Sequence, residues 1–121
     1  MRLHPQDAAA RGIRDGDVVR LYNGRGACLA GAVLSEALRP GVVQLSTGAW
    51  YDPEDPGADR PLCVHGNPNV LTSDIGTSPL AQGCTGQLTS VEIERFDGPP
   101  PRVKAFDPPL SARQDAMGEG K

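Results

Sequence analysis

Residues 65–83 carry the side chains best suited to binding a polar ligand, and they contain no lysine, arginine or glutamate. Side-chain amides both donate and accept hydrogen bonds, and glycine lets a ligand approach the backbone N–H groups closely. A ligand rich in ring nitrogens and carbonyls would use such groups. An ordinary surface loop is the alternative interpretation of the same composition. The candidate binding residues in this stretch are His65, Asn67, Asn69 and Gln82.

Groups that could carry catalysis are sparse. His4 stands at the start of a predicted helix, where a capping role is expected, and His65 has no obvious carboxylate to orient it. The motifs G-x-S-x-G, G-x-x-x-x-G-K, H-E-x-x-H and G-x-G-x-x-G are all absent. We therefore predict a ligand-binding module with no catalytic residue of its own.

The cysteines do not indicate a disulfide framework, because three is an odd number and no C-x-x-C pair occurs. A metal site built from Cys63, His65 and Cys84 would have only three ligands, at a spacing unlike that of structural zinc sites. We predict buried or half-buried thiols and no metal. The acidic residues between positions 52 and 59 lie beside prolines, which is typical of a solvated loop.

Composition indicates one turn-rich β domain. The chain is 38% hydrophobic but only 4% aromatic, so its core must consist mainly of Val, Leu, Ile and Ala. Fifteen glycines and twelve prolines among 121 residues exceed average usage. The net charge of −3 gives no sign of a nucleic-acid partner or of an anionic membrane surface. No apolar run approaches the roughly twenty residues that cross a bilayer.

Short strands joined by tight turns predict a small antiparallel or mixed barrel. Asn23 and Gly24 predict a tight hairpin in which both residues take positive φ. We divide the chain into a barrel domain, residues 1–97, and a proline-rich segment, residues 98–121, that is extended or disordered unless another surface holds it. We expect a helix over 4–12, strands over 18–22, 27–34, 42–45 and 88–94, and a short helix or 3-10 turn over 78–82.

A series of motifs runs through the chain in a fixed order. They are RGIRDGDVVR at 11–20, NGRG at 23–26, LRPGVV at 38–43, GAWYDP at 48–53, GNPNVLT at 66–72, DIGTS at 74–78 and VKAFDPP at 103–109. Together they resemble the C-terminal molybdopterin-guanine-dinucleotide-binding domain of the DMSO reductase family. The resemblance is strongest to the branch that reduces S-oxides and N-oxides, namely DMSO, trimethylamine-N-oxide and biotin sulfoxide reductases.

The resemblance implies a mainly β fold, a double-psi β-barrel of the aspartate-decarboxylase-like class with short helices. It also implies a parent enzyme of several hundred residues, in the bacterial cytoplasm or periplasm. In such enzymes molybdenum is held by two molybdopterin guanine dinucleotides, and oxygen-atom transfer reduces the substrate. The remaining domains of the parent would be the partners of this one, which is not catalytic alone.

The same resemblance implies particular binding residues. The asparagine of an N-x-L-T segment contacts the dinucleotide in this family, and here it is Asn69. The pair before the last strand also contacts it, and here that pair is Gly86 and Gln87. Distant members have Tyr-Lys at that pair, so this chain lacks a cation there. Asn67, His65 and Gln82 are further candidates. Other family contacts lie upstream of Met1, so we expect the 121 residues alone to bind the cofactor poorly.

Two other functions compete with this one. A stand-alone β-barrel interaction module without a cofactor would have a similar composition. A self-sufficient barrel enzyme, such as a pyruvoyl-type decarboxylase, would need a Gly-Ser cleavage site, and no Gly-Ser dipeptide occurs. The sequence therefore favours the cofactor-binding domain, with the interaction module as the alternative.

Overall fold

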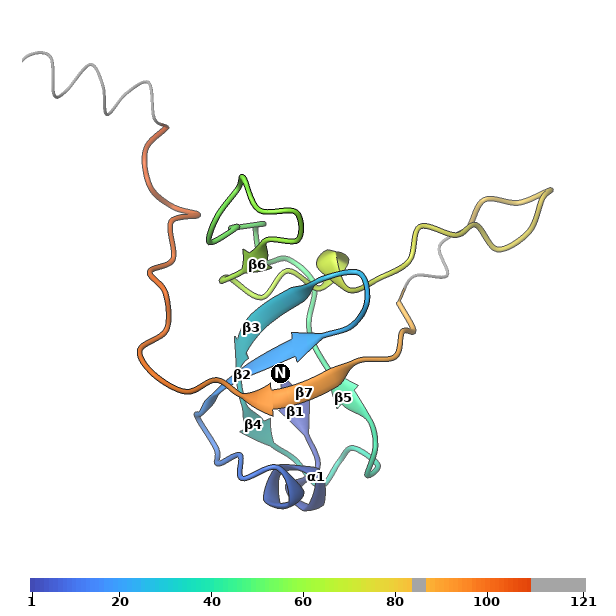
Figure 1. The fold of residues 1–121 in the computed structure, drawn as a ribbon. Helices are drawn as coiled ribbons and strands as arrows, with labels where there is room; N and C mark the ends of the chain where they lie inside the picture. The colour runs from blue at the N-terminus through green and yellow to red at the C-terminus, as the bar shows by residue number, and fades with distance from the viewer. Residues whose placement is uncertain (84–86, 110–121) are drawn as a thin grey trace, which may run out of the picture.

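Two mixed sheets make up most of the regular structure in the computed structural model, which describes residues 1–83 and 87–109 (Figure 1). In the first sheet β1 pairs parallel with β4 and antiparallel with β5. In the second, β2 lies between β3 and β7 in antiparallel pairs, and β3 pairs parallel with β6. The strands are β1 Arg2–Leu3, β2 Val18–Tyr22, β3 Ala27–Gly31, β4 Val33–Leu34, β5 Val43–Gln44, β6 Leu62–Cys63 and β7 Glu92–Arg95.

The prediction of a mainly β, barrel-like domain is confirmed, and its double-psi connectivity stays a prediction. One core lies between the sheets and α1. Its largest fully buried side chains are Leu3, Leu21, Val19, Cys28 and Cys63. No helix in the described ranges is long and apolar enough to cross a membrane.

The β2–β3 hairpin positions much of the candidate site. Alternating residues predict β2, and Val19 and Leu21 are the buried ones. The prediction of positive φ at Asn23 and Gly24 is wrong, because among the described residues only six other glycines have positive φ. The turn is instead a four-residue loop. In it the Oδ1 atom of Asn23 accepts from the N–H of Arg25 at 2.8 Å and of Gly26 at 3.3 Å.

The strand expected over 27–34 is two strands that belong to different sheets. β3 pairs with β2, and β4 pairs with β1. Between them Ala32 is buried and donates its N–H to the carbonyl of Asp17 at 2.8 Å, while its own carbonyl accepts from Gly16 at 2.8 Å. These bonds turn the chain from one sheet to the other at Ala32.

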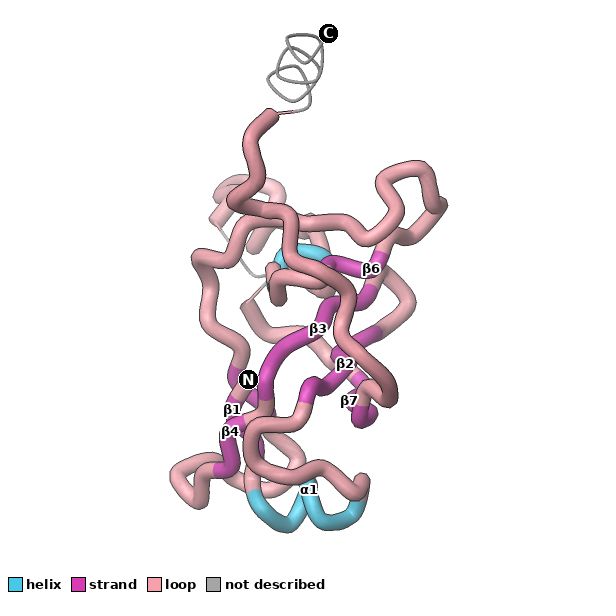
Figure 2. The backbone as a smooth tube through the Cα atoms, turned by 90° about the vertical axis from the view of Figure 1, so that its left-hand side faces the viewer, coloured by secondary structure: helices cyan, strands magenta, loops and turns pink. Residues whose placement is uncertain are grey.

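Helix α1, Pro5–Ala10, confirms the helix expected near the N-terminus. The Nδ1 atom of His4 caps it by accepting from the N–H of Gln6 at 3.0 Å, and Ala8 faces the core. Gly12 follows with a φ of +65°, the left-handed conformation expected after a helix end. Figures 1 and 2 both place α1 at the end of the molecule opposite β6.

Two predicted elements differ from the structure. Neither a helix nor a 3-10 turn forms over 78–82, because the Oγ atom of Ser78 accepts from the N–H groups of Leu80 and Ala81 and closes a different kind of turn. A 3-10 helix, η1 Pro68–Val70, lies instead within the asparagine-rich stretch. The last strand is also shorter than expected, since β7 begins at Glu92 and Leu88 is 92% exposed.

Candidate functional site

The segment that carries Asn69 is built by its neighbour Asn67. The Oδ1 atom of Asn67 accepts from the N–H of Asn69 at 2.9 Å and so caps η1, and Pro68 occupies the first helical turn. Leu71 follows and is buried in the core. The Asn67 amide oxygen therefore has a structural role. Asn69 itself is exposed, and no hydrogen bond within the described part of the chain uses its side-chain amide.

The hairpin loop packs closely against η1 at Gly26. A Cβ atom placed on Gly26 would lie 2.7 Å from the carbonyl oxygen of Val70, closer than real Cβ contacts. Only glycine lets the hairpin and η1 approach this closely without a shift of one of them. The position of η1 is therefore fixed by the hairpin on one side and by Leu71 in the core on the other.

Asn23 joins two segments that are far apart in the sequence. Its Nδ2 group donates to the carbonyl of Leu71 at 2.8 Å and to the carbonyl of Ser90 at 3.2 Å. The hydroxyl of Thr89 also donates to Leu71, at 3.4 Å. These bonds connect the segment that carries Asn69 to the segment that carries Gln87. The sequence indicates Asn23 only as a turn residue, and its place in the NGRG motif is the one signal of a larger role.

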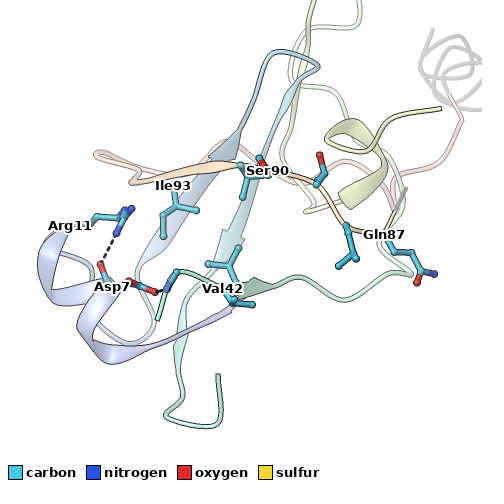
Figure 3. Close-up of a pocket in the computed structure, with 11 residues that line it drawn as sticks. Asp7, Arg11, Val42, Gln87, Ser90 and Ile93 are labelled. Carbon is cyan, nitrogen blue, oxygen red and sulfur yellow. Dashed lines mark hydrogen bonds between the residues drawn. The ribbon is translucent and has the colours of Figure 1, made fainter. Parts of the chain in front are cut away.

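Gln87 lies on an open groove of about 560 Å³ between α1, the chain around β5 and the approach to β7 (Figure 3). At the α1 end, Asp7 accepts from the N–H of Gly41 at 2.7 Å, and Arg11 donates to the carbonyl of Asp7 at 3.3 Å. Among the predicted site residues that the structure describes, only Gln87 lines this groove. Apolar side chains cover much of it, namely Val42, Val43, Leu88, Val91 and Ile93.

His65 and Gln82 lie elsewhere and make local contacts. The Nδ1 atom of His65 is 3.2 Å from the carbonyl oxygen of Trp50, and its ring meets the ring of Phe106 edge-on at 5.2 Å. Gln82 donates to the carbonyl of Ser78 at 3.4 Å within an exposed loop, residues 73–83, that projects from the strands (Figure 1). The structure therefore does not gather all the predicted residues at one place.

Gly86 and Cys84 lie outside the described residues, so the structure does not test the predictions made for them. Within the described ranges no group of three metal-ligating side chains comes together.

Cys28 and Cys63 are buried opposite each other in β3 and β6, as predicted for these thiols. Burial, and then the neighbouring Cys63, raise the pKa of Cys28 to about 12. Cys28 is thus a protonated thiol near neutral pH and a poor nucleophile.

This chain is similar to one protein family and to several known reductases. A family model for the molybdopterin dinucleotide binding domain matches residues 1–90. The trimethylamine-N-oxide reductase of Salmonella typhimurium is 56% identical over 108 residues, which are 89% of this chain and 13% of that protein. The dimethyl sulfoxide/trimethylamine N-oxide reductase of Cereibacter sphaeroides is 49% identical over 110 residues, 91% of this chain and 13% of that protein. The chain thus spans 13% of the length of these relatives.

Proposed function

Because this chain belongs to the molybdopterin dinucleotide binding domain family, we propose that it binds molybdopterin guanine dinucleotide within a larger molybdenum oxidoreductase. Asn69 and Gln87 are the proposed contact residues described by the structure, and Gly86 is proposed with them. The relatives named as trimethylamine-N-oxide and dimethyl sulfoxide reductases support an N-oxide or S-oxide as the substrate class of the parent.

The side chains of this chain fit such a ligand by their chemistry. Guanine and pterin edges present hydrogen-bond donors and acceptors side by side, and a carboxamide offers one of each. The exposed amide of Asn69 stands on a helical turn whose backbone is held by Asn67 and whose end is held by Asn23. An unused amide on a backbone that is already held in place is the observation that carries the proposal, because a preorganised backbone loses little entropy when a ligand binds.

None of the proposed contact residues carries a reactive group, so their role would be to bind and orient the cofactor. The bound molybdenum cofactor would supply the oxygen-atom chemistry, as is general for cofactor enzymes. Asn69 would orient the heterocycle by donating through Nδ2 and accepting through Oδ1. Gln87 would do the same from the edge of the groove. The other domains of the parent would complete the site and contact the substrate.

Cofactor content of the full-length parent enzyme tests the proposed contacts. We expect Asn69→Ala and Gln87→Ala each to lose cofactor roughly two- to tenfold faster than the natural protein, since each removes neutral hydrogen bonds. Molybdenum and GMP released per protein, measured after gel filtration, report the loss. Gln6→Ala is the matched control, because it removes an exposed amide from α1 without touching the groove.

Unchanged molybdenum and GMP in both variants would reject Asn69 and Gln87 as contacts. Thermal unfolding of the variants separates lost contacts from lost folding. The proposal requires that cofactor content falls while the unfolding temperature of the apoprotein stays at that of Gln6→Ala.

A further inference from the structure

The proposed contact residues provide no positive charge to match the phosphates of a dinucleotide. A dinucleotide carries negatively charged phosphates, whereas Asn69 and Gln87 are neutral amides. Burying a phosphate beside neutral groups alone is costly, and proteins usually place arginine, lysine or backbone N–H groups there. A cation that binds such a phosphate should lie next to both contact segments.

Arg25 lies at the junction of the two segments. Its Nη1 group donates to the hydroxyl of Thr89 at 3.4 Å, two residues after Gln87 in the chain. That hydroxyl donates in turn to the carbonyl of Leu71, two residues after Asn69. The Arg25 guanidinium is therefore next to the place where the segments meet.

Arg25 is exposed and makes no ion pair within the described part of the chain. Two arginines of the second sheet are already paired with carboxylates. Arg20 pairs with Glu94 at 3.0 Å, and Arg95 pairs with Asp97 at 2.9 Å. Arg60 lies beside the same hairpin loop but uses its Nη1 group to hold the carbonyl of Gly24 at 2.7 Å. Arg25 thus keeps its charge available.

The backbone of Arg25 is also held in place. Its N–H donates to the Oδ1 atom of Asn23 at 2.8 Å, while the Nδ2 group of Asn23 binds Leu71 and Ser90. Gly26, the next residue, packs against Val70. A side chain on such a fixed loop approaches a ligand at a defined angle. A defined angle favours the bidentate hydrogen bonding of a planar guanidinium to phosphate.

We propose that Arg25 binds a phosphate group of the dinucleotide and supplies the positive charge that the neutral side chains of Asn69 and Gln87 lack. This inference rests on the proposed function and adds an ionic contact to it. Thr89 would orient the guanidinium in the free protein, and the phosphate oxygens would take over its remaining N–H groups.

Cofactor retention by charge variants of the full-length parent enzyme tests the inference. We expect Arg25→Gln to release GMP and molybdenum roughly tenfold faster or more, because charge-assisted hydrogen bonds are lost. Arg25→Lys keeps the charge and should recover most of the retention. Added salt should speed release from the natural protein but have less effect on Arg25→Gln, since salt screens the ion pair. Arg14→Gln, at the opposite end of β2, is the matched control for net charge.

Three results would overturn the inference. If Arg25→Gln retains cofactor like Arg14→Gln while Asn69→Ala loses it, Arg25 makes no phosphate contact and the proposed function stands. If Arg25→Gln and Arg25→Lys lose cofactor equally, with the same response to salt and a lowered unfolding temperature, the role of Arg25 is structural. Retention in Arg25→Gln and in Asn69→Ala alike would reject the proposed function as well.

Discussion

Gly26 is the residue on which the geometry of the candidate site depends most directly. It lacks the Cβ that would meet the Val70 carbonyl at 2.7 Å, whereas a Cβ on Gly24, two residues earlier in the same loop, would meet nothing within 4 Å. Neither glycine has a positive φ, so backbone strain does not distinguish them. The two positions therefore separate the effect of close packing from the general effect of replacing glycine.

We expect Gly26→Ala to destabilise the chain by about 1–3 kcal/mol, as is typical of overpacking, because the hairpin or η1 must shift. Gly24→Ala should be nearly neutral or slightly stabilising, since alanine restricts the unfolded chain. Urea denaturation followed by circular dichroism measures both. Equal effects of the two substitutions would contradict the close approach of Gly26 to Val70.

Cys28 makes the stability of the chain sensitive to alkali. Burial raises its pKa from the ordinary value of 9.0 to about 12, so folding favours the protonated thiol. The unfolded chain loses this proton more readily, and stability therefore falls as pH rises from about 9 toward 12. Below pH 9 the contribution of Cys28 is fully present.

The expected slope contributed by this one thiol approaches about 1.4 kcal/mol per pH unit between the two values. The free energy of unfolding, measured by urea titration at a series of pH values, should fall less steeply in Cys28→Ala than in the natural chain. Parallel pH profiles for the two proteins would show that Cys28 is not the titrating group.

At the scale of elements, local patterns predicted well what depends on local chemistry. The alternation in residues 18–22 predicts β2, and the three alanines at 8–10 with a following Gly12 predict α1. The sequence does not predict that Ala32 ends β3, because that ending depends on hydrogen bonds to Gly16 and Asp17. The 3-10 helix η1 is also missed, since a proline between two asparagines is typical of an ordinary turn.

The limit of local sequence patterns is clearer at the candidate site than in the secondary structure. Asn69 and Gln87 are proposed from a family resemblance, whereas the bonds that connect their segments come from Asn23. Those bonds reach residues 48 and 67 positions away in the chain, and no local pattern of side chains indicates them. The hydrogen bonds of Asn23 to these two segments can be predicted only once the fold is known.

At the scale of the whole molecule, Asp52 holds the C-terminal segment, residues 98–109, against the body of the domain. Asp52 is 4% exposed, and its Oδ2 atom accepts from the N–H groups of Lys104 and Ala105. The ammonium group of Lys104 also donates to the carbonyl of Pro53 at 3.2 Å. Although the described part of this segment has no helix or strand, Asp52 gives it a defined place along the domain (Figure 2).

Replacing Asp52 with alanine should release this segment, because two backbone donors lose a carboxylate acceptor. We expect hydrogen exchange at the amides of Lys104 and Ala105 to accelerate at least about tenfold, while exchange in β2 changes little. Asp59→Ala removes an exposed carboxylate from the same loop and serves as the control. Unaltered protection of both amides in Asp52→Ala would show that other contacts hold the segment.

The position of Trp50 has a spectroscopic consequence. It is the only tryptophan of the chain, it is 63% exposed, and its ring lies 5.6 Å from that of Phe106 in the C-terminal segment. Its fluorescence therefore reports whether Phe106 is docked rather than whether the β core is intact. An emission change on mild denaturation would precede the loss of the β circular dichroism signal, and the two probes together would resolve undocking from global unfolding.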